Sequence, residues 1–288
     1  NSHEILIMPT MAMRAGEAPW AICCAVPVNA PGVRHVYGRQ ASDTRKLEAN
    51  PLDVGNPVFG GQEVMTVFED VFVPEERVFL DGQIDFTGML VERFASYHRQ
   101  SYGGCKVGVG DVLIGAAALI ARMNGVEKAG HIREKLVEMN HLNETLYCCG
   151  LACSSQGEAT AAGNFQVNLL LANVCKLNVT RLPYEIARLA TDVAGGLLGT
   201  LPSAADLDDP ETGPLIRKYL AAQPDHLVVD RIKVLRLIEN LTVGAGAVGY
   251  LIESVHGAGP PAAQRIMIER QADLEGKIAA VKRLLTIA

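Results

Sequence analysis

The chain has 288 residues, of which 49% are hydrophobic and 20% are charged, and its formal net charge at pH 7 is −6. This composition is typical of a globular protein large enough for two domains, and it excludes an intrinsically disordered chain. Because the balance is acidic and Lys and Arg form no cluster, we expect no nucleic-acid partner. No run of about 18 apolar residues lacks a polar break, so we also expect no membrane-spanning helix.

The first ten residues, NSHEILIMPT, have the pattern of an extended segment that continues from preceding residues. The first of them is Asn1 rather than Met. They have the pattern of neither a secretory nor a transit signal. We therefore expect the chain to be the downstream piece of a longer polypeptide. The chain has 7 cysteines, an odd number, which without a signal favours reduced thiols and a cytoplasmic location.

Residues 1–85 are predicted to form a β-rich domain. Proline and glycine separate short apolar or alternating runs at residues 5–8, 20–28, 33–37 and 64–72. Short strands at this spacing are typical of a β-sandwich or a small barrel. The polar stretch 41–56 is predicted to be a loop.

Residues 86–288 follow the helical period instead. We predict helices near residues 86–123, 126–157, 164–195, 211–221, 225–256 and 261–286. Asp209, Pro210 and Glu211 form a helix-start signal, and the run GAGPP at 257–261 stops one helix before the next begins. Long helices with short connections favour an antiparallel bundle, so the predicted fold class is α+β.

One stretch, FASYHRQSYGGCKVGVGD at residues 94–111, combines three reactive side chains. His98, Tyr102 and Cys105 are spaced by four and three residues, which places them on one stripe of a helix. An imidazole, a phenol and a thiolate there are suited to ligating a metal or cluster and to moving a proton. The alternative is a packed helix stripe with a core cysteine and a satisfied histidine.

Two glycine pairs lie in helical surroundings. Gly103 and Gly104 each cost a helix about 1 kcal/mol relative to alanine. They are tolerable if another backbone, a cofactor or a substrate must come close. Gly195 and Gly196 follow a long apolar helix, where they form either a plain helix end or a set of N–H groups for a phosphate.

The other cysteines form a second candidate group. Cys149 and Cys153 are four residues apart beside Cys148, so they share a helix face and are alternative metal ligands. Buried cysteines in a helix interior are common as plain packing, and packing is the favoured interpretation here. Packing is the interpretation for the remaining cysteines, Cys23, Cys24 and Cys175.

Two carboxylates are candidates for acid–base chemistry. Glu63 precedes an apolar strand, where it is either a proton-transfer group or solvated at the strand edge. Glu253 ends an apolar helix together with His256, and a desolvated carboxylate there would be useful in proton transfer. The alternative for this pair is helix capping or a salt bridge.

Taken together, these stretches resemble the 4-hydroxybutyryl-CoA dehydratase (vinylacetyl-CoA delta-isomerase) family. That family is grouped with the flavin-dependent 4-hydroxyphenylacetate 3-monooxygenases on an acyl-CoA-dehydrogenase-like fold. The resemblance covers essentially the whole chain. It is carried by NSHEILIMPT, VFEDVFVPEERVFL at 67–80, HRQSYGGCKVGVGD at 98–111, TDVAGG at 191–196 and ESVHGAGPPAAQRIMI at 253–268.

The resemblance implies a FAD and a [4Fe-4S] cluster in each active site. The positions that match the family's cluster ligands are His98 and Cys105. The positions that match its other functional side chains are Glu63, Tyr102, Lys106 and Glu253. The flavin is expected to contact the β-rich domain between His3 and Thr10, and Asp192, Gly195 and Gly196 of a neighbouring subunit in a homotetramer.

The implied reaction is dehydration of 4-hydroxybutyryl-CoA to crotonyl-CoA. The thioester acidifies the α-proton but not the β-proton, so the resemblance implies a radical route in which the flavin exchanges one electron and the cluster iron assists the departing hydroxide. On this hypothesis His98 is the base. Tyr102 and Glu253 deliver protons, and Glu63 assists the departing hydroxyl.

This sequence departs from the family pattern in one respect. The family's other two cluster ligands are cysteines of an N-terminal helical domain, and that domain is missing here. The chain is therefore expected to need that segment as a partner. Cys149 and Cys153 remain alternative ligands, although they fall in another part of the family's fold. Two rival functions stay open, namely a cluster-free aromatic hydroxylase of the same fold and a non-catalytic piece that only binds its N-terminal partner.

Overall fold

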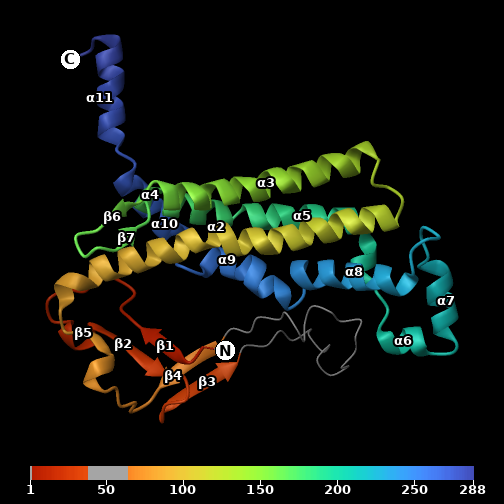
Figure 1. The fold of residues 1–288 in the computed structure, drawn as a ribbon, viewed down its shortest axis with the longest axis horizontal. Helices are drawn as coiled ribbons and strands as arrows, with labels where there is room; N and C mark the ends of the chain where they lie inside the picture. Colours follow the sequence, from red (N-terminus) through yellow and green to blue (C-terminus); the bar gives the residue numbers. More distant parts are fainter. Residues whose placement is uncertain (1, 38–63) are drawn as a thin grey trace. The chain divides into compact units, whose positions relative to one another are not determined.

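The computed structural model describes residues 2–37 and 64–288, and the described residues form two compact units. The first unit takes the described residues up to position 98, and the second takes residues 99–288. The described residues contain both strands and helices, with most strands near the start of the chain, so the predicted mixed class is confirmed (Figure 1). Glu63 and the predicted loop at 41–56 lie outside the described residues.

The first unit holds small antiparallel sheets. Its described strands are β1 (Glu4–Ile7), β2 (Ile22–Pro27), β3 (Val33–Tyr37), β4 (Val64–Phe68) and β5 (Val78–Asp81). The strand order is β1-β2-β5 in one sheet, and β3 pairs with β4 in another. The four predicted runs contain β1 to β4, although the start of the second run is a 3₁₀ turn, Ala18–Trp20, and the fourth run ends early. Strand β5 was not predicted, because its four residues follow an acidic turn.

The centre of the first unit is built on β2. Its register against β5 shifts between Cys23 and Cys24, which is a β-bulge. A bulge turns successive side chains off the strict two-residue alternation. Both thiols are buried as a result, which confirms the packing interpretation for this pair. Ala21, Cys23 and Leu80 form the local core.

The second unit is predominantly helical. Its elements begin with the end of the long helix α2 (Ile84–Met123), followed by α3 (Gly130–Ser155), the hairpin β6 (Glu158–Ala159) and β7 (Phe165–Gln166), α4 (Leu169–Val179), α5 (Leu182–Ala194), α6 (Ala204–Asp208), α7 (Thr212–Tyr219), α8 (Val228–Thr242), a π-helix (Val248–Ile252), α9 (Glu253–His256), α10 (Pro261–Gln271) and α11 (Leu274–Leu285). In Figure 1 the helices α2, α3 and α5 run beside one another.

Three predicted helices are each divided in two, and those predictions were wrong in length. Residues 164–195 contain β7 and then a break between α4 and α5, where Pro183 begins a new helix because it lacks the N–H that the interior of a helix needs. Residues 225–256 are interrupted after Thr242 in a glycine-containing stretch. The last predicted helix is interrupted at Asp273, which has a left-handed φ of 44° and caps α11 through its side chain.

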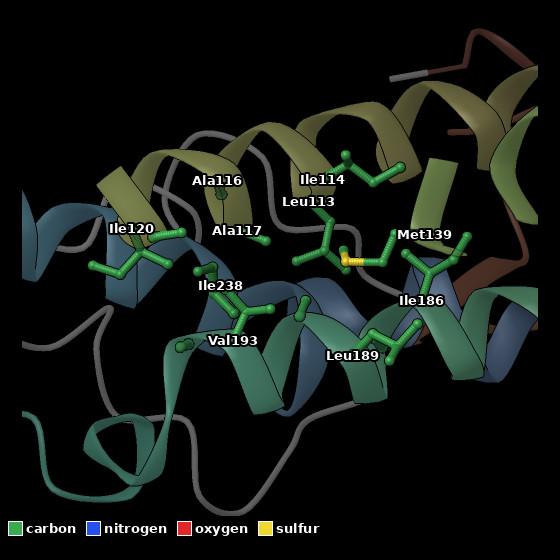
Figure 2. Packing of buried hydrophobic residues seen from close by; sticks show 14 of the residues in the cluster. Leu113, Ile114, Ala116, Ala117, Ile120, Met139, Ile186, Leu189, Val193 and Ile238 are labelled. Atoms are coloured by element: carbon green, nitrogen blue, oxygen red, sulfur yellow. The ribbon is translucent and has the colours of Figure 1, made fainter. Parts of the chain in front are cut away.

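Apolar side chains of four long helices form the main core of the second unit. Leu113, Ala117 and Ile120 of α2 are fully buried against residues such as Val193 of α5 and Ile238 of α8 (Figure 2). Small residues on α2 let these helices approach closely, so the core is continuous along the helix. This framework holds the part of α2 that directly follows the reactive stretch.

By length and composition alone, α2 is apolar enough to cross a membrane, with a mean hydropathy of 1.7 in its most apolar window. One helix of this kind carries little weight, because core helices of globular proteins pass the same test. Half of that window is buried inside the protein. We therefore interpret α2 as a core helix.

Candidate active site

Tyr102 is the centre of a polar cluster inside the second unit. Its side chain is 1% exposed, and two ammonium groups lie against its ring. The Lys106 Nζ is 4.7 Å from the ring centroid, and the Lys176 Nζ is 5.0 Å from it. Each distance is within the range of a cation–π interaction, which is stronger in a desolvated site such as this one. The ring is thereby held by two helices, α2 and α4.

Lys106 connects this ring to the π-helix and α9. Its ammonium donates to the Glu253 carboxylate at 2.5 Å and to the Gly249 carbonyl at 2.6 Å. A π-helix disrupts the ordinary helical pairing and often marks a functional site. Helix capping and a salt bridge were the alternatives to a proton-transfer role for Glu253. A salt bridge is observed, and its partner is Lys106 instead of His256. The carboxylate is still partly exposed, with 37% of the side chain accessible.

Lys176 is the second buried ammonium. It donates to the Ser254 carbonyl oxygen and, at 3.4 Å, to that of Val255. Burial, followed by the positive charges of Lys106 and Arg99, lowers the pKa of Lys176 to about 8. The electronegative carbonyls at the end of α9 are a favourable environment for its charged form.

Arg99 completes a set of three cations around this segment. Its guanidinium donates to the Ala258 carbonyl at 3.0 Å and to the Asn173 side-chain oxygen at 2.7 Å. The three basic side chains thus bind carbonyl oxygens before, within and after α9. Among the described residues, Glu253 is the carboxylate that pairs with one of these cations, Lys106.

Gly257 lets the phenol and the carboxylate come together. A Cβ on Gly257 would overlap the Tyr102 hydroxyl and would lie 2.9 Å from the Glu253 Cγ. The Tyr102 oxygen and the Glu253 side chain therefore both lie against Gly257, closer than any side chain at that position would allow. From the sequence, Tyr102, Lys106 and Glu253 could be grouped only through a family resemblance, and the structure brings all three together.

Cys105 and His98 lie on either side of Tyr102 along α2. Cys105 belongs to the second unit and is exposed, and partial desolvation raises the pKa of its thiol while Lys106 opposes that shift. His98 belongs to the first unit, where its ring packs edge-on against Phe94 at 5.9 Å. Among the described residues no three His, Cys, Asp or Glu side chains are grouped as metal ligands.

The glycine pair on α2 has two different surroundings. A Cβ on Gly103 would lie 2.6 Å from the Gly150 Cα of α3 and 3.1 Å from the Cys175 Sγ. A Cβ on Gly104 would meet nothing within 4 Å. Another backbone therefore comes close at Gly103, as the sequence analysis allowed, and the Gly104 side of α2 is bare beside Cys105.

The residues expected to hold a flavin lie outside the Tyr102 cluster. Asp192 pairs with Lys135 of α3 at 2.8 Å, and that hydrogen bond lowers the pKa of the Asp192 carboxyl. Gly195 ends α5 with a φ of +77°, and neither it nor Gly196 has an atom near the position of a Cβ. His3 and Thr10 are exposed residues of the first unit.

The cysteines of α3 and α4 adjoin this cluster, since Cys175 directly precedes Lys176 in α4. Cys153 and Cys175 are fully buried and share a hydrogen bond between their thiols. Cys149 accepts a hydrogen bond from the Asn178 side chain at 3.6 Å. A pocket of about 420 Å³ is lined by Cys148, Cys149 and both polar and apolar residues of α3 and α4, among them His141 and Glu144. These contacts are those of packed thiols.

Sequence reasoning missed Lys176, Arg99 and Asn173. One signal was available, because Lys176 is the single charged residue of the apolar helix LLLANVCKLNV and Asn173 lies three residues before it, on the same face. A polar pair at core positions of a helix indicates buried partners. The partners themselves come from residues more than 70 positions away in the chain, at 99 and 254.

The fold is that of known flavoprotein oxygenases whose structures are solved, and this likeness concerns the fold alone. It superposes with a TM-score of 0.85 on the oxygenase component (HpaB) of 4-hydroxyphenylacetate 3-monooxygenase complexed with FAD, at 22% identity over 98% of this chain and 59% of that one. A TM-score of 0.97 is reached with an archaeal 4-hydroxybutyryl-CoA dehydratase from N. maritimus, at 52% identity over 100% of this chain and 57% of that one.

The chain belongs to the 4-hydroxyphenylacetate 3-hydroxylase family, since the family's C-terminal model matches residues 87–286 and its N-terminal model matches residues 1–80. It is 56% identical to the 4-hydroxybutyryl-CoA dehydratase/vinylacetyl-CoA-Delta-isomerase of Clostridium aminobutyricum over its whole length. It is 26% identical to the 4-hydroxyphenylacetate 3-monooxygenase oxygenase component of Thermus thermophilus over 88% of its length. The chain spans 60% and 52% of those two relatives. The resemblance to the dehydratases is thus confirmed.

Proposed function

We propose that the protein to which this chain belongs dehydrates 4-hydroxybutyryl-CoA to crotonyl-CoA and isomerises vinylacetyl-CoA. One observation supports this most directly. Tyr102, Lys106 and Glu253 converge around Gly257 in a chain that is 56% identical to a dehydratase of that specificity. The acyl-CoA substrate, the lyase activity and the isomerase activity all follow from this proposal.

The reaction needs proton transfers at two carbons. The thioester carbonyl acidifies the α-position, and a base must take that proton. The proton at the β-position is not acidified, so its removal needs a positioned acid–base pair and activation from a cofactor. We assign the first transfer to His98. The second transfer and the final protonation are assigned to Tyr102 and Glu253.

The geometry suits Tyr102 and Glu253 to proton delivery. Lys106 holds the Glu253 carboxylate at 2.5 Å, and its contact with the Tyr102 ring fixes the phenol near that carboxylate. A partly exposed carboxylate is able to exchange its proton with solvent between turnovers. Glu63, which lies outside the described residues, is proposed to assist the departing hydroxyl.

A FAD is the first proposed cofactor. The HpaB structure of similar fold is complexed with FAD. The bare backbone at Gly195 and Gly196 fits the close approach of a bulky ligand, with Asp192 beside it. The β-rich domain would contribute the residues from His3 to Thr10.

A [4Fe-4S] cluster is the second proposed cofactor. Cys105 fits as a ligand, because it is exposed beside the bare Gly104, and His98 is proposed as another. Such clusters take four ligands, so two must come from outside the described residues, and the missing N-terminal segment is the proposed source. When bound, the flavin would supply one-electron chemistry and the cluster iron would supply a Lewis acid.

The remaining proposals concern organisation. We propose a β-rich flavin and substrate domain at residues 1–85, with a sandwich or barrel of the acyl-CoA-dehydrogenase type. A helical domain of antiparallel bundle type would follow at residues 86–288. The complete protein is proposed to form a cytoplasmic homotetramer.

The test uses the complete polypeptide, purified without oxygen and loaded with FAD and iron. This complete protein is expected to convert 4-hydroxybutyryl-CoA to crotonyl-CoA. Chromatography of the CoA esters measures the conversion. His98→Ala and Tyr102→Phe should each lower kcat by about 100-fold or more, as expected for loss of an acid–base group. Full dehydratase activity in His98→Ala would show that its assigned role is wrong.

A second candidate is a flavin-dependent aromatic hydroxylase, which the family model and the 26% identity to a 4-hydroxyphenylacetate 3-monooxygenase favour. That enzyme would need no cluster. Iron and acid-labile sulfide analysis of the complete protein separates the two, since a hydroxylase should contain neither. A third candidate is a non-catalytic piece that binds an N-terminal partner, and the native mass of the protein from its source decides that question.

A further inference from the structure

Lys176 lies in the middle of an apolar helix and is fully buried. A core position that only had to be filled would accept Leu or Met, because replacing a buried charged group by an apolar one of similar volume is often neutral or stabilising. An ammonium here therefore indicates a task that depends on its charge or its hydrogen bonds.

The contacts of Lys176 point to that task. It donates to the Ser254 and Val255 carbonyls of α9, the helix that begins with Glu253, and it lies 5.0 Å from the Tyr102 ring centroid. The Lys176 ammonium thus contacts the helix that carries Glu253 and the ring of Tyr102, the two side chains proposed to deliver protons. Lys106 also contacts the Tyr102 ring, but it binds the Glu253 carboxylate itself instead of the backbone of α9.

The charges around Lys176 come from several elements. The titratable and charged groups that face it are Arg99, Tyr102 and Lys106 of α2, Glu253 of α9 and Cys175 of its own helix, whose thiol bonds to Cys153 of α3. Among the described residues, the groups that face Lys176 thus include two further cations and one carboxylate. Because burial lowers the pKa of Lys176 to about 8, its charge changes in a pH range where enzyme activity can be measured.

We propose that Lys176 is a positioning residue for the dehydration, whose ammonium holds the Tyr102 ring and helix α9 together so that the phenol and the Glu253 carboxylate face one reacting group. This inference rests on the proposed function for the identity of that group, an acyl-CoA thioester. A thioester that loses its α-proton develops negative charge on its carbonyl oxygen, and an ammonium group nearby stabilises that charge.

The first test compares Lys176→Met with Lys176→Arg in the complete, cofactor-loaded protein. The Met variant is expected to lose about 10-fold or more in kcat with KM within about threefold, since positioning acts on the reacting step more than on binding. The Arg variant keeps the charge, so it should recover much of kcat. In wild type, kcat should fall as the pH rises through about 8, where Lys176 loses its proton, and this fall should move to higher pH in the Arg variant.

Lys218→Met is the matched control. The Lys218 Nζ also lies 5.0 Å from a tyrosine ring, that of Tyr219, but this pair is on the surface of α7, where Tyr219 is 71% exposed. Its removal deletes a lysine–tyrosine contact of the same length away from the site. It should leave kcat and the pH profile unchanged.

A second readout does not need activity. With ¹³Cζ-labelled tyrosine, the Tyr102 resonance is assigned by its loss in Tyr102→Phe and then compared among the variants. It should move in Lys176→Met and stay in place in Lys218→Met. If the wild-type protein had no dehydratase activity, the proposed function would fail and this resonance would still test the contact.

The inference is overturned if Lys176→Met keeps both the wild-type kcat and the wild-type Tyr102 resonance. If the Met variant does not fold, wild type and Lys176→Arg decide the matter. An alkaline fall in kcat at the same pH in both proteins would then contradict the proposal, and a fall displaced to higher pH in the Arg variant would support it.

Discussion

At the scale of single residues, the geometry of the site depends on what Gly257 lacks. Its φ of −62° is one that any residue adopts, so glycine is not needed there for backbone freedom. It is needed because a Cβ would overlap the Tyr102 hydroxyl and crowd Glu253. A small residue at this position is therefore a requirement of the site itself.

Gly257→Ala is expected to impair catalysis more than folding. The added methyl group must displace the phenol or the carboxylate, and misplacing a catalytic group by about 1 Å can cost about 100-fold in rate. Overpacking should lower the free energy of unfolding by about 1–3 kcal/mol. Steady-state kinetics and denaturant unfolding of the complete protein measure both effects. Gly130→Ala, where a Cβ meets nothing, is the control. An unchanged kcat in Gly257→Ala would show that the phenol and the carboxylate need not be so close.

At the scale of helices, Gly103 and Gly104 provide an internal comparison. Gly103→Ala places a methyl group against the Gly150 backbone and the Cys175 thiol, so α2 must move away from α3 and α4. We expect the free energy of unfolding to fall by about 1–3 kcal/mol. Gly104→Ala meets open space, so the helix propensity of alanine should raise it by up to about 1 kcal/mol. Urea unfolding of the chain without cofactors measures both. Equal effects of the two substitutions would contradict the observed helix crossing.

Helix positions could largely be predicted from the sequence, whereas helix ends often could not. The 3.6-residue period of apolar side chains located the helices of the second unit, because burial of one face produces that period directly. The breaks between α4 and α5 and at Asp273 were missed, because apolar periodicity continues across them while Pro183 and the left-handed Asp273 interrupt the hydrogen bonds. A stop consisting of several glycines and prolines, such as the one after His256, was found.

The candidate site divides in the same way. The stripe of Tyr102 and Cys105 was visible from spacing alone, because both belong to one helix. Lys176 and Arg99 were not found, because each is recognised as part of the site only through a partner on another helix. Lys176 binds Ser254, and Arg99 binds Asn173. Sequence separation hides contacts of that kind unless homologous sequences are compared or the fold is known.

At the scale of the whole molecule, burial of Lys176 makes stability depend on pH. Burial, followed by repulsion from Lys106 and Arg99, lowers the pKa of Lys176 from 10.5 to about 8. Between those two values the unfolded chain binds more protons than the folded chain, so the free energy of unfolding rises with pH in that window. The full cost is present below pH 8 and is on the order of 3 kcal/mol.

Lys176→Met should remove this dependence. The difference in unfolding free energy between the variant and wild type is expected to be most favourable to the variant near pH 7 and to shrink as the pH rises toward 10. Denaturant unfolding at several pH values measures it. Lys218→Met, on the surface, should show a constant difference. If the Lys176→Met difference were also constant, the buried lysine would not be the origin of the pH dependence.

The assembly of the molecule is testable at helix α11. None of its residues is buried in the single chain, yet Leu274, Ile278, Val281 and Leu285 follow one another at steps of four, three and four residues. That spacing forms one apolar stripe, and a helix of 12 residues is only marginally stable in water without a partner for such a stripe. In the proposed homotetramer, a second copy of the chain is the expected partner.

Ile278→Glu should therefore weaken assembly and leave the rest of the fold intact. A carboxylate in the middle of the stripe would have to be desolvated at the contact, so we expect association to weaken by about 10-fold or more, equivalent to about 1.4 kcal/mol. Sedimentation velocity of the complete protein across a dilution series measures the change. Ala280→Glu adds the same charge two residues on, outside the stripe, and should leave the assembly unchanged. If Ile278→Glu also left it unchanged, the partner of α11 would lie within the same polypeptide and the homotetramer would have to form through other surfaces.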